Sequence, residues 1–254
     1  MRIPYSYGGE MTFGDRFLIV GHRGLRERYI ENSMEGFIAA KSAGLEAVEL
    51  DIQLTKDKKV VVFHDADLTR LCGISGKVWD YTYQDLEKLK LQGGKERIPN
   101  LSEVLDNLGS LKVFIELKTI DHQSGLVNEG LEAVLATEIL NRDISNYRFL
   151  SFNPHTLKNL KKKNGEIITG LNVSKEAINY LGELNLKMLK DYDIDFVQPD
   201  YEMFLSGRIS KLEKAGMPII PWTVNDEKNA MLCKERGAAG IITDIPLKLM
   251  EKIR

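Results

Sequence analysis

Two short apolar stretches of this 254-residue chain carry carboxylates in places where a buried strand would carry hydrocarbon side chains. In the first, AVELDIQ, Glu49 and Asp51 alternate with apolar residues, so a strand would turn both acids to one face. The second, KVFIEL, repeats the design with Glu116, and Lys118 follows on the same face. Buried acids side by side are unfavourable, because each raises the cost of ionising the other and both lose solvation. A cation held between these carboxylates would remove that cost.

The ligands offered by Glu49, Asp51 and Glu116 are oxygen atoms alone. Oxygen ligands suit Mg²⁺ or Ca²⁺ better than zinc, which favours nitrogen and sulfur. Zinc would be expected to recruit His22 or His64, and it stays the minority alternative. The sequence therefore predicts a divalent metal site, with Mg²⁺ and Ca²⁺ both open.

Two histidines, His22 and His64, directly follow apolar runs, and two cations, Arg23 and Lys118, lie close to the acids in the sequence. A pair of histidines can act as general base and general acid across a phosphorus centre. Arg23 and Lys118 beside a metal would suit a phosphate whose charge grows in the transition state. The set favours phosphodiester cleavage over glycoside hydrolysis, which would leave the histidines and cations without a role.

Apolar runs rich in valine and isoleucine alternate with amphipathic segments along the chain, as expected for parallel strands covered by helices. The candidate strands are residues 17–20, 47–53, 60–63, 112–117, 148–152, 167–171, 196–198, 218–224 and 240–243. This order predicts a (β/α)8 barrel rather than an open doubly wound sheet. The first run is followed by HRGLR and not by GxGxxG, so a dinucleotide-binding fold is not indicated. Active sites of such barrels lie at the C-terminal ends of the strands, where the histidines and acids of this chain fall.

Two irregularities interrupt the alternation. Residues 54–59 are too few for a crossover helix, so the second and third runs must be joined by a short, hairpin-like turn. Residues 66–99 form a long interval that we interpret as a small insertion after the third strand, with a helix from Thr82 to Leu91 capped by Thr82 and Asp85. The whole chain, 1–254, is otherwise predicted to be one barrel domain.

Helix starts are marked by capping residues. Asn100 with Glu103 resembles a capping box, and Asn153-Pro154 is the pattern of an N-cap followed by the first helical residue. Asn225 is predicted to cap a helix that ends near Gly237.

The composition excludes several classes of protein. Net charge is −2 and no segment is strongly basic, so neither nucleic acid nor an anionic membrane surface is an expected partner. No apolar run is long enough for a transmembrane segment. The two cysteines, Cys72 and Cys233, form neither a disulfide framework nor a metal-binding pattern. A cytoplasmic protein is therefore expected; the sequence leaves its oligomeric state open.

Taken together, these residues resemble the glycerophosphodiester phosphodiesterase family. The resemblance extends from Leu18 to Pro246 and is carried by several short motifs in order: His22-Arg23-Gly24, Glu31-Asn32-Ser33, Glu49-Leu50-Asp51, His64-Asp65, Ile98-Pro99-Asn100-Leu101, Glu116-Leu117-Lys118 and Trp222-Thr223-Val224-Asn225. Any one of these motifs would be weak evidence, whereas seven in order are specific. Ser33 stands where the family usually has threonine, and either hydroxyl can cap the following helix.

The resemblance implies a (β/α)8 barrel with a small insertion after the second histidine. It also implies hydrolysis of glycerophosphodiesters to sn-glycerol 3-phosphate and an alcohol, through a cyclic phosphate formed by the substrate's own glycerol hydroxyl. The implied site consists of His22 and His64 as acid and base, Glu49, Asp51 and Glu116 on the metal, Arg23 and Lys118 on the phosphate, Glu31 and Asn32 shaping the site, and Trp222 against the glycerol.

Two other functions remain open from the sequence. A lysophospholipase D-type hydrolase would use the same residues and would need an apolar groove at the mouth of the site. A barrel that binds a phosphorylated ligand without turnover would be expected to lack a histidine or a metal carboxylate, and all are present here. The alcohol released, and which histidine is the acid, are not decided by the sequence.

Overall fold

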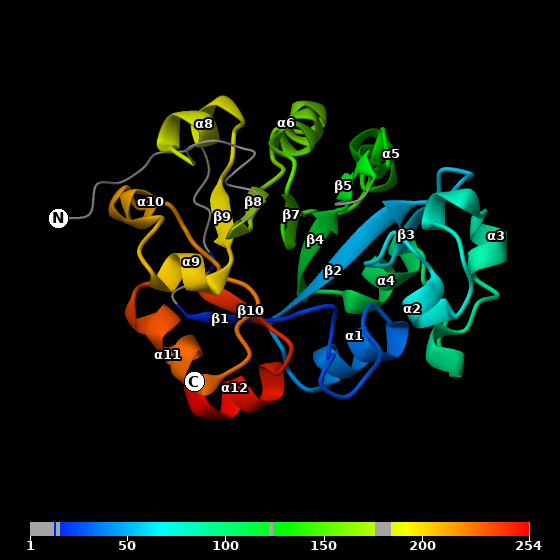
Figure 1. Ribbon diagram of the computed structural model, residues 1–254, viewed down its shortest axis with the longest axis horizontal. Helices are drawn as coiled ribbons and strands as arrows, with labels where there is room; N and C mark the ends of the chain where they lie inside the picture. Colours follow the sequence, from blue (N-terminus) through cyan, green and yellow to red (C-terminus); the bar gives the residue numbers. More distant parts are fainter. Residues whose placement is uncertain (1–12, 14–15, 122–123, 176–183, 254) are drawn as a thin grey trace.

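The structure is a computed structural model that describes Phe13 and residues 16–121, 124–175 and 184–253. Its centre is a parallel sheet that curls around an axis, with helices on the outside (Figure 1). Seven strands follow one another in the order β10-β1-β2-β4-β7-β8-β9. Their bounds are β1 Leu18–Gly21, β2 Ala47–Leu54, β4 Lys112–Leu117, β7 Tyr147–Ser151, β8 Thr169–Val173, β9 Phe196–Pro199 and β10 Gly240–Thr243.

The gap between β9 and β10 is filled by residues 218–224, which the sequence predicts as a strand. Ile220 N donates to Val197 O of β9 at 3.1 Å, and Ile242 N of β10 donates to Pro221 O at 2.9 Å. The segment is therefore extended and bonded on both sides, but it is not a regular strand, because its two prolines have no N–H to donate. The predicted (β/α)8 barrel is confirmed, with this segment in the place of its remaining strand.

The short turn after β2 leads into β3 (Val60–Val62), which pairs antiparallel with β2. The predicted hairpin is thus confirmed. After β3 comes the predicted insertion, 66–99, which carries α2 (Thr69–Cys72), η1 (Val78–Asp80), α3 (Tyr83–Leu86) and η2 (Leu91–Gly93). The helix from Thr82 to Leu91 is shorter than expected, but its reciprocal cap between Thr82 and Asp85 is present. The insertion packs on its own apolar cluster, made by Phe63, Leu68, Leu71, Val78, Leu86, Leu91 and Ile98.

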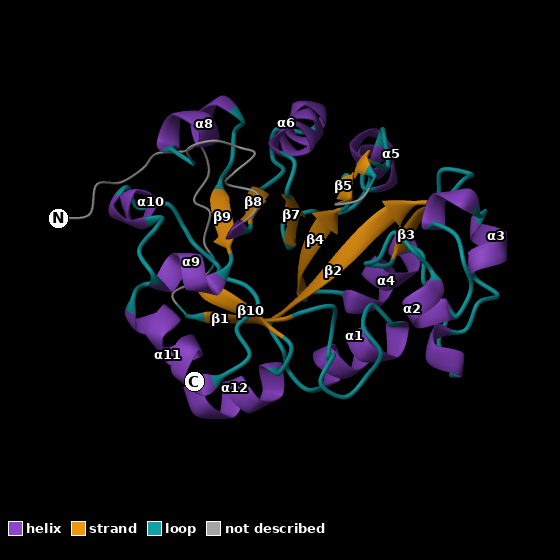
Figure 2. Ribbon diagram, in the orientation of Figure 1, coloured by secondary structure: helices purple, strands orange, loops and turns teal. Residues whose placement is uncertain are grey.

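The remaining helices surround the sheet, as the purple ribbons of Figure 2 show. They are α1 Met34–Ser42, α4 Leu101–Leu108, α5 Leu131–Glu138, α6 Pro154–Lys163, α8 Leu186–Asp191, α9 Tyr201–Leu205, α10 Ser210–Lys214, α11 Glu227–Glu235 and α12 Pro246–Ile253. A hairpin, β5 (Ile120–Asp121) and β6 (Gly125–Leu126), lies between β4 and α5. Among the described residues, none of the helices has the length and apolar character needed to cross a membrane.

The predicted helix caps are largely confirmed. Ser33, Asn100 and Asn153 each accept a hydrogen bond from a backbone N–H in the first turn of the following helix. The prediction for Asn225 is wrong, because Asp226 caps α11. Asn225 instead binds the chain beyond β10, as described below.

The barrel interior is built in layers. One layer, on the N-terminal side of the polar residues of the cavity, is apolar and includes Ala47, Phe114, Leu150, Phe196 and Ile242. Phe13 closes this end by packing edge-on against Phe196, with the ring centroids 5.2 Å apart. Two residues further along the chain the same face carries residues that line the cavity, because side chains on one face recur every second residue. Those residues are Glu49, Glu116, Phe152, Asn172 and Gln198.

Candidate active site

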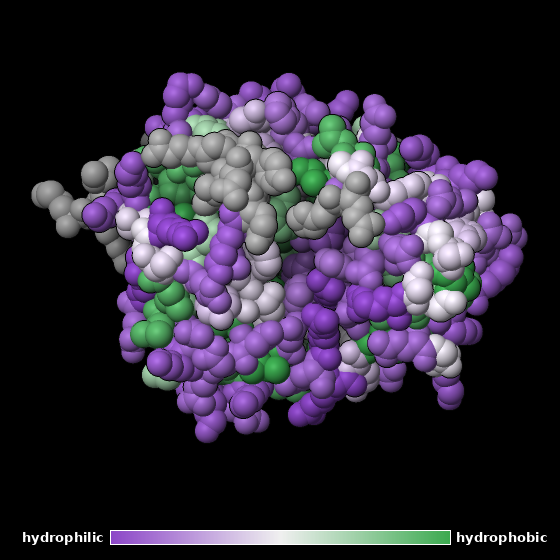
Figure 3. All heavy atoms as spheres, in the orientation of Figure 1, coloured by the Kyte–Doolittle hydropathy of each residue, from purple (hydrophilic) through white to green (hydrophobic). Residues whose placement is uncertain are grey.

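A cavity of about 1090 Å³ opens at the C-terminal ends of the strands. Figure 3 looks onto this face, where hydrophilic residues border a hollow in the middle of the molecule. The cavity brings together most of the residues predicted from the sequence, and its walls include His22, Arg23, Glu49, His64, Glu116, Lys118 and Trp222. Three predicted residues, Glu31, Asn32 and Asp51, do not line it. They are buried behind the wall, and each bonds to Arg23 or Lys118, which do line it.

The acidic cluster is built by register. Asp51 of β2 pairs with Glu116 of β4, and Glu49 lies two residues before Asp51 on the same face. One ligand oxygen from each of the three carboxylates lies within 4.8 Å of the others, and all three residues are buried. Burial, with the charges of Asp51 and Glu116, raises the pKa of Glu49 well above its usual value. Three crowded, hard oxygen donors fit a divalent cation, which would relieve that repulsion.

Two cations already face this cluster. Lys118 Nζ lies 2.6 Å from Glu116 Oε1 and 2.9 Å from Asp51 Oδ1. Arg23 Nε is 3.3 Å from Asp51 Oδ2. Burial alone would raise the pKa of Asp51, but Lys118, His64 and Arg23 lower it well below its usual value. The carboxylates of the site therefore differ in pKa. Asp51 is stabilised as the anion, whereas Glu49 resists ionisation.

The backbone around the cluster is held in an uncommon conformation. Arg23 and Asn32 both have positive φ, 54° and 55°, and Asn32 N donates to Arg23 O at 3.0 Å. This geometry lets Arg23 N donate to Glu49 Oε2 at 3.1 Å. It also lets Asn32 Nδ2 donate to Asp51 Oδ2 at 2.9 Å. The two residues thus fix the orientation of two carboxylates of the cluster.

Each histidine is held by a carboxylate. His22 Nδ1 lies 2.7 Å from Asp244 Oδ1, and His64 Nδ1 lies 2.7 Å from Asp65 Oδ1. Because an ionised carboxylate only accepts, Nδ1 carries the proton in each pair and Nε2 is left for proton transfer. His22 Nε2 is 3.9 Å from Glu49 Oε2. Burial lowers the pKa of His22, and the hydrogen bond to Asp244 offsets this only in part.

Glu31 gathers three guanidinium groups behind the wall. Its Oε1 accepts from Arg23 NH1 at 2.7 Å and from Arg70 NH2 at 2.6 Å, and its Oε2 lies 3.2 Å from Arg26 NH2. Burial would raise the pKa of Glu31, but the bonds to Arg70 and Arg23 lower it to about 2. Arg70 also donates from Nε to Asp65 Oδ2 at 2.6 Å. The network therefore joins the surroundings of both histidines.

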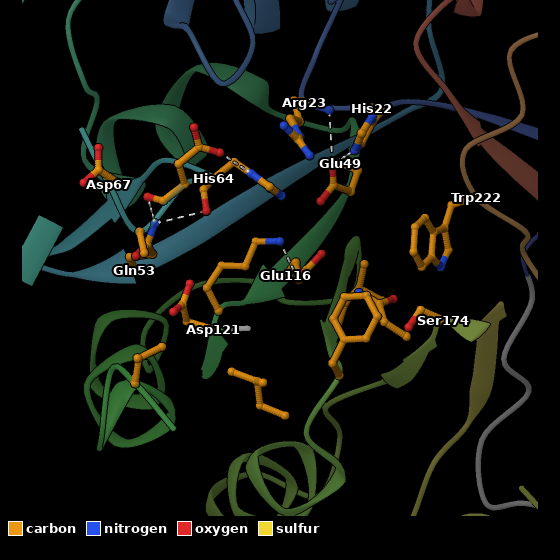
Figure 4. A pocket seen from close by; sticks show the side chains of 18 of the residues that line it. His22, Arg23, Glu49, Gln53, His64, Asp67, Glu116, Asp121, Ser174 and Trp222 are labelled. Carbon is orange, nitrogen blue, oxygen red and sulfur yellow. Dashed lines mark hydrogen bonds and ion pairs between the residues drawn. The ribbon is translucent and has the colours of Figure 1, made fainter. Parts of the chain in front are cut away.

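The cavity has two opposed walls (Figure 4). Gln53 and Asp67 lie on the side of the insertion, near His64, whereas Trp222 and Ser174 lie on the other side. Trp222 donates from Nε1 to Gln198 O at 2.7 Å and meets Phe152 edge-on, with ring centroids 5.8 Å apart. An aromatic surface thus forms the wall furthest from the insertion.

Asp244 has a place in the site that the sequence interpretation missed. It comes directly after β10, and Asn225 fixes it by donating from Nδ2 to Oδ2 at 2.8 Å and by accepting from Asp244 N at 2.8 Å. The sequence does contain a signal for Asp244, because a polar residue at the C-terminal end of a barrel strand is a candidate functional residue. Arg26 and Arg70 were missed too, and neither has a comparable signal, because each reaches the site from a loop or from the insertion.

Comparison with known proteins agrees with this geometry. The family model described as "Glycerophosphoryl diester phosphodiesterase family" matches residues 22–248. A glycerophosphodiester phosphodiesterase of Caldanaerobacter subterraneus subsp. tengcongensis is 31% identical over 252 residues, covering 93% of this chain and 98% of that protein. A Rattus norvegicus protein named as a lysophospholipase D is 27% identical over 268 residues, covering 91% of this chain and 84% of that protein.

Among solved structures, an Oleispira antarctica phosphodiesterase in complex with the product sn-glycerol-3-phosphate has the same fold. Its TM-score is 0.82 at 25% sequence identity, and the match covers 93% of this chain and 96% of that one. The fold, the cavity and the match over nearly the whole chain lead to one conclusion: this chain belongs to the glycerophosphoryl diester phosphodiesterase family.

Proposed function

We propose that this protein is a metal-dependent phosphodiesterase that hydrolyses glycerophosphodiesters to sn-glycerol 3-phosphate and an alcohol. The observation that carries the proposal is the pair of histidines, each held at Nδ1 by a carboxylate at 2.7 Å, on one cavity with the acidic cluster. Family membership and the product complex of the Oleispira antarctica relative support the choice of substrate.

Glu49, Asp51 and Glu116 would hold the metal, and their oxygen donors favour Mg²⁺ or Ca²⁺. When bound, such a cation neutralises charge on a phosphoryl oxygen and lowers the pKa of a nearby hydroxyl. Arg23 and Lys118 would bind the phosphate from the cavity wall. Asn32 would act through Asp51, and Glu31 would act by orienting Arg23.

The positions of the histidines relative to the two walls suggest which histidine is the general base and which is the general acid in the first step. His22 lies nearer the Trp222 wall, where we place the glycerol, and His64 lies nearer the insertion, where we place the departing alcohol (Figure 4). His22 Nε2 would take the proton of the glycerol 2-hydroxyl as its oxygen attacks phosphorus. His64 would protonate the alcohol oxygen as its bond to phosphorus breaks.

The first step leaves a cyclic phosphate, which water must open. His64, now neutral, would take a proton from water as the water oxygen bonds to phosphorus. His22 would return its proton to the glycerol 2-oxygen as that bond breaks, which regenerates both histidines and releases sn-glycerol 3-phosphate. Intramolecular attack is physically favourable, because positioning replaces a bimolecular encounter.

The test is hydrolysis of glycerophosphocholine and glycerophosphoethanolamine by the purified protein, with EDTA and with Mg²⁺ or Ca²⁺ added back. His64→Ala serves as the control, and calorimetry checks that this variant still binds the metal. Metal-dependent release of glycerol 3-phosphate that His64→Ala loses is the expected result. Metal binding without turnover of any substrate would reject the proposal in favour of a ligand-binding barrel.

A lysophospholipase D-type activity is the second candidate, favoured by apolar side chains at the rim. Ile120, which lines the cavity, is 42% exposed, and Leu126 on the facing strand of the same hairpin is 78% exposed. Such residues could contact an acyl chain. Turnover of a lysophospholipid in preference to glycerophosphocholine, reduced by Ile120→Ser, would favour this activity.

The cysteines support a reducing compartment, and we propose the cytoplasm. Cys72 and Cys233 are both free thiols. Burial raises the pKa of Cys72 to about 11 and is the main reason that the pKa of Cys233 rises to about 12. Both thiols are therefore protonated and unreactive at neutral pH.

A further inference from the structure

Two buried amides stand side by side on the wall of the cavity. Asn172 of β8 and Gln198 of β9 are partners in the register of the sheet, so their side chains share one face. That face is the barrel interior, and both residues line the cavity. Asn172 is only 3% exposed and Gln198 only 1%.

These amides have polar atoms without a partner in the described part of the chain. Asn172 Oδ1 and both Gln198 Oε1 and Nε2 are buried and form no hydrogen bond. A buried amide without a partner is destabilising, and most buried polar groups in native proteins are satisfied. The pair therefore needs an explanation outside the protein's own hydrogen bonds.

Gln53 provides the contrast within the same barrel. It is 1% exposed and also lines the cavity, but its Nε2 donates to three carbonyl oxygens, those of Phe63 at 2.9 Å, His64 at 3.2 Å and Asp65 at 2.7 Å. Gln53 thus holds the strand end that carries His64. Gln198 makes no such side-chain bond, so a structural role does not account for its amide.

We infer that Asn172 and Gln198 recognise hydroxyl groups of the substrate's glycerol, an inference that rests on the proposed function. An amide offers a donor and an acceptor without charge, which complements hydroxyl groups that both donate and accept. The phosphate would instead be held by Arg23 and Lys118. Gln198 also accepts the Trp222 indole N–H at its backbone oxygen, so it belongs to the wall where we place the glycerol.

The experiment compares Asn172→Leu, Gln198→Leu and the matched control Gln53→Leu with the wild type. Calorimetry measures the Kd of sn-glycerol 3-phosphate and, separately, of inorganic phosphate. We expect Asn172→Leu and Gln198→Leu each to weaken sn-glycerol 3-phosphate binding about tenfold, the effect of one lost hydrogen bond with an unpaired partner. Phosphate binding should stay within about twofold. The KM values of glycerophosphocholine and glycerophosphoethanolamine should rise by the same factor, because the two substrates share the glycerol and differ only in the alcohol.

Thermal unfolding separates a binding role from a structural one. Replacing an unpartnered buried amide by leucine removes a destabilising group, so Asn172→Leu and Gln198→Leu should unfold at the same or a higher temperature than the wild type. Gln53→Leu removes the donor to three carbonyl oxygens and should unfold at a lower temperature.

Three results would overturn the inference. Unchanged binding of sn-glycerol 3-phosphate would mean that the amides hold only an ordered water. A KM that rises for only one of the two substrates would indicate that the amides recognise the departing alcohol and not the glycerol. A fall in unfolding temperature like that of Gln53→Leu would indicate a structural role. If the wild type hydrolyses no glycerophosphodiester, the proposed function fails instead, and the calorimetric comparison still shows what the amides bind.

Discussion

His22 Nδ1 lies 2.7 Å from Asp244 Oδ1, although 222 positions separate the two residues in the chain. They meet because β1 and β10 are neighbours in the barrel, with Gly21 beside Thr243, so the residues that follow each strand emerge together. The His64–Asp65 pair, in contrast, joins adjacent residues. One histidine is therefore oriented by barrel closure and the other by local chain geometry.

Asp244→Asn should reduce kcat by roughly 10²-fold, the range of one general acid–base contribution, because it disturbs the His22 tautomer. Asp244 raises the pKa of His22, so its loss should lower that pKa further. If His22 is the base and must be neutral, the acidic limb of the kcat/KM profile should shift to lower pH. Asp65→Asn is the comparison, and an equal shift in that variant would contradict the assignment of His22 as base.

Metal binding should release a proton. Burial and neighbouring charges raise the pKa of Glu49, so below that raised pKa the metal-free protein carries a proton there that a cation must displace. The apparent metal affinity should therefore increase with pH until Glu49 is ionised in the free protein. Calorimetry in two buffers with different ionisation enthalpies measures the release. Glu49→Gln should remove both the release and the metal-dependent rise in Tm.

Glu31→Gln should lower stability in a pH-dependent way. The pKa of Glu31 falls from 4.5 to about 2, so its stabilisation is complete above about pH 4.5 and disappears as the pH falls toward 2. At pH 7 the loss should be about 2–3 kcal/mol after allowance for solvent screening. Urea unfolding at several pH values provides the measurement. The exposed Glu35→Gln should change stability by less than about 0.5 kcal/mol, and an equal effect would argue against the Glu31 network.

Lys118→Met should destabilise the metal-free protein and make its Tm more dependent on metal. The Nζ bridges Asp51 and Glu116, so its removal leaves buried carboxylates unpaired, at a cost of about 3–5 kcal/mol for a buried ion pair. A divalent cation at the cluster should restore part of this loss. Thermal melts with EDTA and with Mg²⁺ or Ca²⁺ test it. Lys112→Met, at the start of the strand that Lys118 follows, is the control, and an equal loss there would contradict the argument.

Much of the site was determined locally by the sequence. The two-residue period of a strand puts Glu49 and Asp51 on one face wherever that strand lies, and the barrel pattern puts His22 and His64 at strand ends. The caps at Ser33, Asn100 and Asn153 depend on the first turn of their own helices, and they form as predicted. Local rules suffice for such features, because the partners lie within a few residues of each other.

The tertiary structure alone decided which distant residues meet. Asp51 faces Glu116 through the register of β2 with β4, and Asn172 stands beside Gln198 through that of β8 with β9. Asn225 does not cap the helix as predicted, because its side-chain amide bonds instead to the carboxylate and the backbone N–H of Asp244 at the end of β10. Strand periodicity determines the face that a side chain takes, but the neighbour across the sheet depends on how the whole barrel closes.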